Sequence, residues 1–215
     1  MFFDVLHTDI TTAHLFAQLP GHMKKLDNIK DAIRQEVIDH IQNESYRWSD
    51  LAQVLHIMDT DGAFIDDSCV MKDDATELTY RKDCIVARNP EFIKYRNHEK
   101  RKRMKELCAM HHLTYQTREI PYQAYYMSRN LDHALHNISE DLSQEDKSQY
   151  ARTFRSRYKD DIPGFLALIN DTSLAVEGDY RQTWNYIAQG LHSLERNSNI
   201  HLALTERYAS ASDIG

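Results

Sequence analysis

Residues 54–62 read VLHIMDTDG, a mostly apolar run followed by two aspartates one residue apart and then a glycine. Such a run is typical of a strand buried on both faces, as in parallel sheets. Side chains two positions apart on a strand point the same way, so Asp59 and Asp61 are predicted to share one face at its carboxyl end. Gly62 lets the backbone turn sharply after them. In open α/β sheets, ligands bind at this edge.

Strands and helices are predicted to alternate along the first part of the chain. The expected strands are 2–6, 53–58, 84–87, 113–115 and 119–127, and the expected helices are 9–19, 23–42 and 90–110. Residues 62–79 are expected to form an acidic loop with a short strand pair. This order favours an α/β fold with a mixed, largely parallel central sheet flanked by helices.

The chain is predicted to have two parts and a tail. Residues 1–127 form the α/β core, and residues 128–206 form a helical C-terminal part that packs on it. Helical spacing recurs there at 129–137, 144–158, 161–170, 179–189 and 198–206. The tail, 207–215, is expected to fray.

Composition excludes several classes of protein. A formal net charge of −7 over 215 residues argues against a surface dedicated to non-specific nucleic-acid binding, although a local basic groove remains compatible with it. Three cysteines without a C-x-x-C pair fit a reducing compartment. No apolar run approaches the roughly 18–20 residues that span a bilayer, and the N-terminus lacks a basic signal-peptide region. We therefore expect a cytoplasmic protein with no membrane contact.

The aspartate pair suits a hard divalent cation. Mg²⁺ binds oxygen ligands, few of them from protein and the rest from water or phosphate, and Mn²⁺ accepts the same donors. Asp59 and Asp61 are therefore predicted as metal ligands. The alternative is a solvated turn, because aspartate and glycine are common turn residues. A second polar cluster, around Asp132 at a strand-to-helix switch, is either part of the site or a helix cap.

The predicted helix at 90–110 carries the densest cationic run of the chain, KYRNHEKRKRMK at 94–105. Arginine forks pair with phosphate oxygens, and Tyr95 is available for stacking. The predicted nucleic-acid contacts are Arg96, Lys100, Arg101 and Arg103. A solvated helix face and a dock for an acidic partner are the alternatives.

The chain resembles the RloB-like branch of TOPRIM-related bacterial proteins in four stretches taken together. They are VLHIMDTDG, RNHEKRKRMKEL, IPYQAYYMSRNLDHAL and SLERNSNIHLAL. The resemblance implies that Asp59 and Asp61 are metal ligands and that Asp132 stands where the family has a glutamate, the three acting as catalytic residues. It also implies a magnesium- or manganese-dependent nuclease that works with an AAA- or ABC-type ATPase in phage defence or abortive infection.

The chain departs from that family at its first strand, where the expected glutamate is missing. The only nearby acids are Asp4 and Asp9. This departure supports an alternative, a non-catalytic partner or sensor that keeps the TOPRIM-like fold. The letters DTDGA also resemble haloacid-dehalogenase-type phosphatases, in which the first aspartate is the nucleophile and the second an acid–base group. Assembly into a homo-oligomer is compatible with all three hypotheses.

Overall fold

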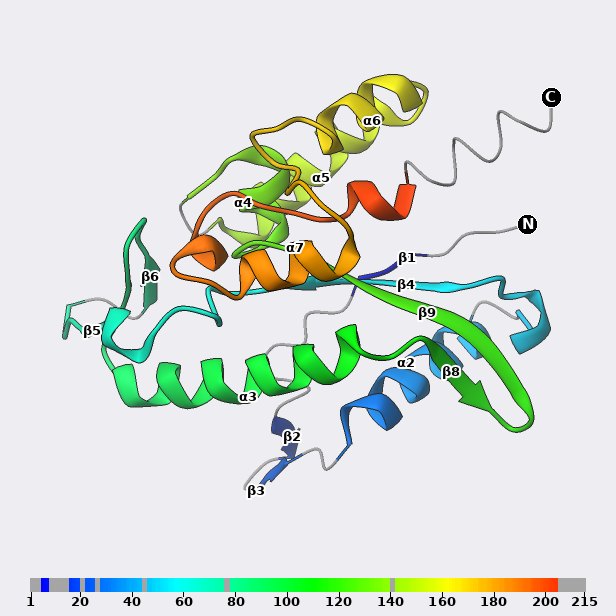
Figure 1. The fold of residues 1–215 in the computed structure, drawn as a ribbon, viewed down its shortest axis with the longest axis horizontal. Helices are drawn as coiled ribbons and strands as arrows, with labels where there is room; N and C mark the ends of the chain where they lie inside the picture. The colour runs from blue at the N-terminus through cyan, green and yellow to red at the C-terminus, as the bar shows by residue number, and fades with distance from the viewer. Residues whose placement is uncertain are drawn as a thin grey trace. The chain divides into compact units, whose positions relative to one another are not determined.

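The computed structural model in Figure 1 describes residues 5–7, 16–19, 22–25, 28–43, 46–75, 78–139 and 142–204, which form a mixed α/β structure. The chain divides into two compact units, each made of two separate stretches. The first unit takes residues 1–58 and 95–125, and the second takes residues 59–94 and 126–215.

A four-stranded sheet has the order β1-β4-β9-β8. Its strands are β1 (Val5–His7), β4 (Val54–Asp59), β8 (His112–Tyr115) and β9 (Arg118–Met127). The β1–β4 pair is parallel, with Val5 opposite Leu55, and the β8–β9 pair is antiparallel. β4 thus lies between two strands, and most of its residues are buried, as its apolar run predicts. The sheet is mixed.

The helix α2 (Ile29–Asn43) belongs to the first unit and lies against β8. Four apolar residues, spaced four apart, form one buried stripe along it: Ile29, Ile33, Val37 and Ile41. This spacing places them on a single helical face, so burial of that face holds the helix on the sheet.

Two short strands precede α2 where helices are predicted. β2 (Phe16–Leu19) pairs with β3 (His22–Lys25) in antiparallel fashion. The helix predicted over 9–19 is therefore wrong at 16–19, and the helix predicted over 23–42 begins only at Ile29. Pro20-Gly21 is a turn signal between two paired strands as well as a helix breaker. Residues 9–15 lie outside the described residues.

The second unit contains a three-stranded sheet with the order β5-β7-β6. Its strands are β5 (Val70–Lys72), β6 (Leu78–Tyr80) and β7 (Ile85–Ala87), after the 3₁₀ turn η2 (Asp67–Cys69). β7 runs parallel to β5 and antiparallel to β6. The strand predicted at 84–87 is confirmed as β7. Two short strands do occur around 62–79, but each pairs with β7 and they do not form the predicted pair with each other. A buried cluster packs here: Ile65, Val70, Ile85, Ala87, Ile93 and Leu194.

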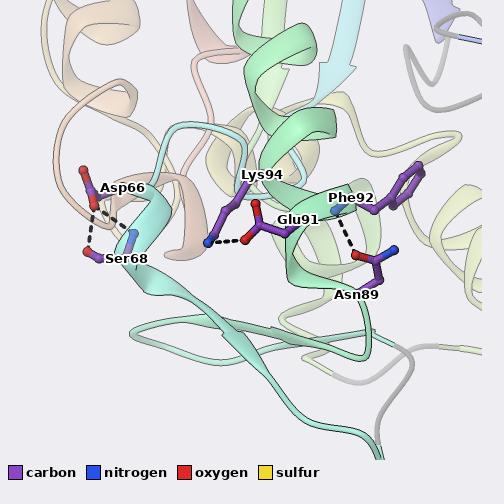
Figure 2. A network of polar contacts seen from close by, with 6 residues as sticks. All are labelled: Asp66, Ser68, Asn89, Glu91, Phe92 and Lys94. Carbon is purple, nitrogen blue, oxygen red and sulfur yellow. Dashed lines mark hydrogen bonds and ion pairs between the residues drawn. The ribbon is translucent and has the colours of Figure 1, made fainter.

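The helix α3 (Pro90–Cys108) begins where the sequence Asn89-Pro90-Glu91 predicts. Asn89 Oδ1 accepts a hydrogen bond from the Phe92 amide at 3.2 Å, as Figure 2 shows. Lys94 Nζ lies 2.7 Å from Glu91 Oε1, and this contact raises the pKa of Lys94. In the same view, Asp66 caps η2 by accepting hydrogen bonds from the Ser68 amide and hydroxyl. Each cap satisfies an amide at the start of its helix.

The second unit also carries the predicted C-terminal helices. They are α4 (Leu131–His136), α5 (Gln144–Tyr158), α6 (Ile162–Ile169) and α7 (Tyr180–Ile187), followed by helical residues at 201–204. In the ranges that the structure covers, no helix is long and apolar enough to cross a membrane.

A buried polar network joins the end of β9 to residues near 199. The Tyr126 amide donates to Asn199 Oδ1 at 2.9 Å, and Asn199 Nδ2 donates to Thr183 Oγ1 at 3.1 Å. The Tyr126 hydroxyl donates to the Thr183 carbonyl at 3.0 Å. All three residues are fully buried, and burial raises the pKa of Tyr126. Buried polar groups are tolerated only when paired, so this network ties the two segments together.

We expect Asn199→Ala to lower the free energy of unfolding by about 2–4 kcal/mol, because it removes the partners of a buried amide and a buried hydroxyl. Chemical denaturation measures this loss. Asn170→Ala is the control, since Asn170 is exposed and its side-chain amide donates to the Leu166 carbonyl of its own helix. Equal losses in the two variants would contradict the role of Asn199.

Candidate functional site

The two predicted acids lie at the carboxyl end of β4. Asp59 is its last residue and is 8% exposed. Asp61 lies beyond the strand, in a turn, with a φ of 48°, and Gly62 follows with a φ of 63°. The prediction that both acids share one strand face is therefore wrong for Asp61. The chain leaves its extended conformation between them, so the alternation of strand side chains no longer applies.

Gly62 is required by its conformation and its packing. A Cβ atom at this position would lie 2.6 Å from Leu194 Cδ2 and 3.1 Å from Ile85 Cδ1. Its φ also lies in the left-handed region that favours glycine. The turn that carries Asp61 is thus pressed against the core of the second unit.

The loop after β9 runs beside this turn. The Thr60 amide donates to the Met127 carbonyl at 3.0 Å, and the Asp61 amide donates to the Arg129 carbonyl at 2.7 Å. The loops that follow two neighbouring strands of the sheet therefore meet. The sequence predicts a site at such an edge.

The Thr60 side chain links these loops to a third segment. Its hydroxyl oxygen accepts a hydrogen bond from the Arg129 amide at 2.9 Å and donates to the Ser193 carbonyl at 3.3 Å. Ser193 Oγ in turn accepts from the Phe64 amide at 3.3 Å. Thr60 and Ser193 are both fully buried. Nothing in the sequence near Asp59 signals Ser193, which lies more than a hundred positions away.

Arg129 is a buried cation at the same edge. It is 5% exposed and has a φ of 55°. Its Nη2 donates to the Ser139 carbonyl at 2.6 Å, and its guanidinium carbon lies 5.1 Å from the centroid of the Tyr80 ring. These contacts hold the guanidinium in place, and the left-handed backbone is retained because the surrounding bonds define it.

The polar cluster at the start of α4 acts as a helix cap. Asn130 Oδ1 accepts from the His133 amide at 2.8 Å. Asp132 is half-buried in the first helical turn, where a negative charge is favourable. The cap interpretation of this cluster is therefore confirmed for Asn130, while a catalytic role of Asp132 stays a prediction.

His133 is a buried histidine in the polar cluster around Asp132. It is 6% exposed, and its Nδ1 has no hydrogen-bond partner among the described residues. Burial lowers the pKa of His133 to about 4, with the nearby charge of Arg129 acting in the same direction and a hydrogen bond to the Ser128 main chain opposing it. The imidazole is therefore neutral at pH 7.

The three predicted catalytic acids do not form one cluster. Among the described residues, no group of three or more His, Cys, Asp or Glu side chains could hold a metal ion. Asp132 is thus not brought together with Asp59 and Asp61 into such a group. Two carboxylates still suit Mg²⁺, which keeps several of its waters. Asp4 and Asp9, the acids near the first strand, lie outside the described residues.

Three of the four predicted nucleic-acid contacts are buried in the structure. Arg96, Lys100 and Arg103 are 7%, 0% and 5% exposed, and Arg101 is half-buried. Arg96 donates to Asn97 Oδ1 through Nε at 3.2 Å and Nη2 at 2.8 Å. These residues belong to the first unit, whereas Asp59 and Asp61 belong to the second. Their contact with nucleic acid stays a prediction.

We expect Thr60→Val to lower the free energy of unfolding by about 1–3 kcal/mol, because it buries an isosteric side chain without the hydroxyl that bonds Arg129 and Ser193. Thr60→Ser keeps the hydroxyl and should lose less. Urea denaturation of both variants measures the difference. A valine variant as stable as the wild type would show that the hydroxyl is dispensable.

The histidine predicts how stability depends on pH. The folded pKa of His133, about 4, lies below its ordinary value of 6.5, so only the unfolded chain gains a proton between them. The contribution of His133 is therefore complete above about pH 6.5 and declines by about 2–3 kcal/mol as the pH falls to 4. In His133→Gln, the free energy of unfolding should therefore fall less between pH 6.5 and pH 4. If the free energies of unfolding of the wild type and this variant fell in parallel from pH 7 to pH 4, the lowered pKa of His133 would be contradicted.

Comparison of the chain with protein-family models, with curated proteins and with solved structures finds no match. The RloB-like assignment and the phosphatase hypothesis therefore both stay predictions.

Proposed function

We propose that the chain is a TOPRIM-like, magnesium-dependent nuclease in which Asp59 and Asp61 are the metal ligands. The observation that carries this proposal is the position of Asp59, an almost buried carboxylate that ends the interior strand β4. Burying a carboxylate costs desolvation free energy, and a bound cation would offset it. The backbone of Asp61 is fixed by the hydrogen bond from its amide to the Arg129 carbonyl.

Four side chains at the end of β4 and on α4 would take part in metal binding and catalysis. Asp59 and Asp61 supply oxygen donors, and the hydroxyl of Thr60 fixes the turn that carries them. Asp132, half-buried on α4, is the candidate base. A magnesium or manganese ion at the acids would activate water and stabilise the charge that builds on phosphate oxygens. Because Mg²⁺ needs few protein ligands, the pair leaves positions for water and phosphate.

The proposal includes a partner. The resemblance of the four quoted stretches to RloB-like proteins points to an AAA- or ABC-type ATPase, and to a defence system as the setting. This chain and the ATPase would act on the same nucleic acid.

Metal binding and cleavage test the proposal together. We expect Mg²⁺ or Mn²⁺, at about ten times its Kd, to raise the melting temperature by about 3–5 °C. Cleavage of end-labelled DNA and RNA in Mg²⁺ should fall about 100-fold or more in Asp59→Asn and Asp61→Asn, because even partners of metal ligands cost 10–100-fold when removed.

The control removes two other acidic charges, by Asp74→Asn and Asp160→Asn. Both residues are exposed, and each lies near a lysine, Lys72 or Lys159. Metal response and cleavage should be unchanged in this control. Cleavage at the wild-type rate by Asp61→Asn protein would rule out the nuclease.

A second candidate is a non-catalytic partner or sensor with the same fold. The absence of a third acid beside Asp59 and Asp61, within the residues that the structure describes, favours it. This protein would bind the ATPase without cleaving nucleic acid. A melting temperature that millimolar Mg²⁺ leaves unchanged, together with no cleavage, would support it over the nuclease.

A further inference from the structure

One face of α3 in the first unit is lined by three cations and a histidine. His98, Arg101, Lys102 and Lys105 surround a surface hollow of about 450 Å³. Their spacing of three, four and seven residues places them on a single side of the helix. His98, Lys102 and Lys105 are exposed, and Arg101 is half-buried.

These cations differ from the buried ones on the same helix. Arg103 is buried, for example, with its Nη2 3.6 Å from Glu99 Oε2, and is part of the packed side. In the described part of the chain, the side chains of His98, Lys102 and Lys105 make neither an ion pair nor a hydrogen bond. Like charges one helical turn apart repel each other, so the fold gains nothing from gathering them.

The charge of this face runs against that of the whole chain, which is −7. Two acids lie within this stretch of the helix. Glu99 is buried, with its Oε2 3.6 Å from Arg103 Nη2, and Glu106 is half-buried, four residues after Lys102. From His98 to Lys105 the helix rises roughly 10 Å. The face therefore matches a phosphate backbone in the sign of its charge.

An aromatic side chain extends the same face. Tyr95 lies three residues before His98 and seven before Lys102, and it is 44% exposed. Aromatic rings beside a cationic groove stack unpaired bases, which a duplex does not present. A tyrosine at this place therefore favours a single strand.

We propose that this face, formed by Tyr95, His98, Arg101, Lys102 and Lys105, binds a single-stranded polynucleotide. The phosphates would lie on the cations and a base on the Tyr95 ring. The inference rests on the proposed nuclease function, for which it names the substrate class, but strand binding requires no metal.

Fluorescence anisotropy with labelled oligouridylate and oligothymidylate in EDTA tests the proposal. For three or four phosphate contacts, log K should fall against log salt with a slope of about −2 to −3. Changing Arg101, Lys102 and Lys105 together to Gln should weaken binding about tenfold or more and reduce the slope by about 2. Tyr95→Leu should weaken binding about fivefold or more without changing the slope.

The matched control changes three exposed cations of α5, Lys147, Arg152 and Arg155, to Gln. It removes the same charge and should bind as the wild type does. Equal weakening by both triple variants, or no binding by the wild type at low salt, would overturn the proposal. So would tighter binding of duplex, or competition by polyglutamate as effective as that by oligouridylate, which would indicate an acidic protein. Comparing oligouridylate with oligothymidylate separates RNA from DNA.

The Asp59→Asn protein separates this inference from the proposed function. It should bind the strand in EDTA as tightly as the wild type does. If the wild type binds the strand but does not cleave it in Mg²⁺, the proposed nuclease is wrong and the binding face still holds. If the wild type cleaves and the triple variant of α3 binds the strand as tightly as the wild type, the binding face is wrong and the nuclease still holds.

Discussion

The arrangement of the candidate site depends on the buried hydroxyl of Thr60. It accepts a hydrogen bond from the Arg129 amide and donates one to the Ser193 carbonyl, so one side chain joins three segments that are distant in sequence. Each of these groups would carry a desolvation cost if left unpaired, and the joint is therefore kept or lost as a whole. The turn with Asp61 takes its shape from this joint and from the close packing of Gly62 on Leu194.

The second unit contains several buried polar side chains. A hydrogen-bonded network, shielded from water, joins Tyr126, Thr183 and Asn199, and two more buried polar residues, Arg129 and His133, follow Tyr126 within seven positions. Such networks specify one arrangement, because a shifted segment would leave donors or acceptors unsatisfied. Rigidity of this kind suits a site, since ligating or reacting groups must be held in a defined geometry. It also makes the unit sensitive to acid through the neutral His133.

The helix α3 separates two roles that look the same in its sequence. Lys100 and Arg103 are buried, whereas Lys102 and Lys105, each two positions further on, are exposed. A helix turns by about 100° per residue, so a dense run of cations necessarily contributes to both sides. The buried members support the fold, and the exposed members are free to contact a polyanion. The acids of β4 and the exposed face of α3 therefore support two proposals that stand on separate residues.

The sequence by itself determined the elements whose signals are local. The apolar run of β4, the Asn89 cap of α3, the strands of 112–127 and the helices after residue 130 follow from spacing and capping, which act over a few residues. Tertiary structure alone decided that residues 16–25 contain paired strands, that Asp61 lies in a left-handed turn, that Ser193 meets Thr60, and that Lys100 is buried. Each of these depends on contacts between distant segments, whose free energies outweigh local preferences and leave no short-range pattern in the chain.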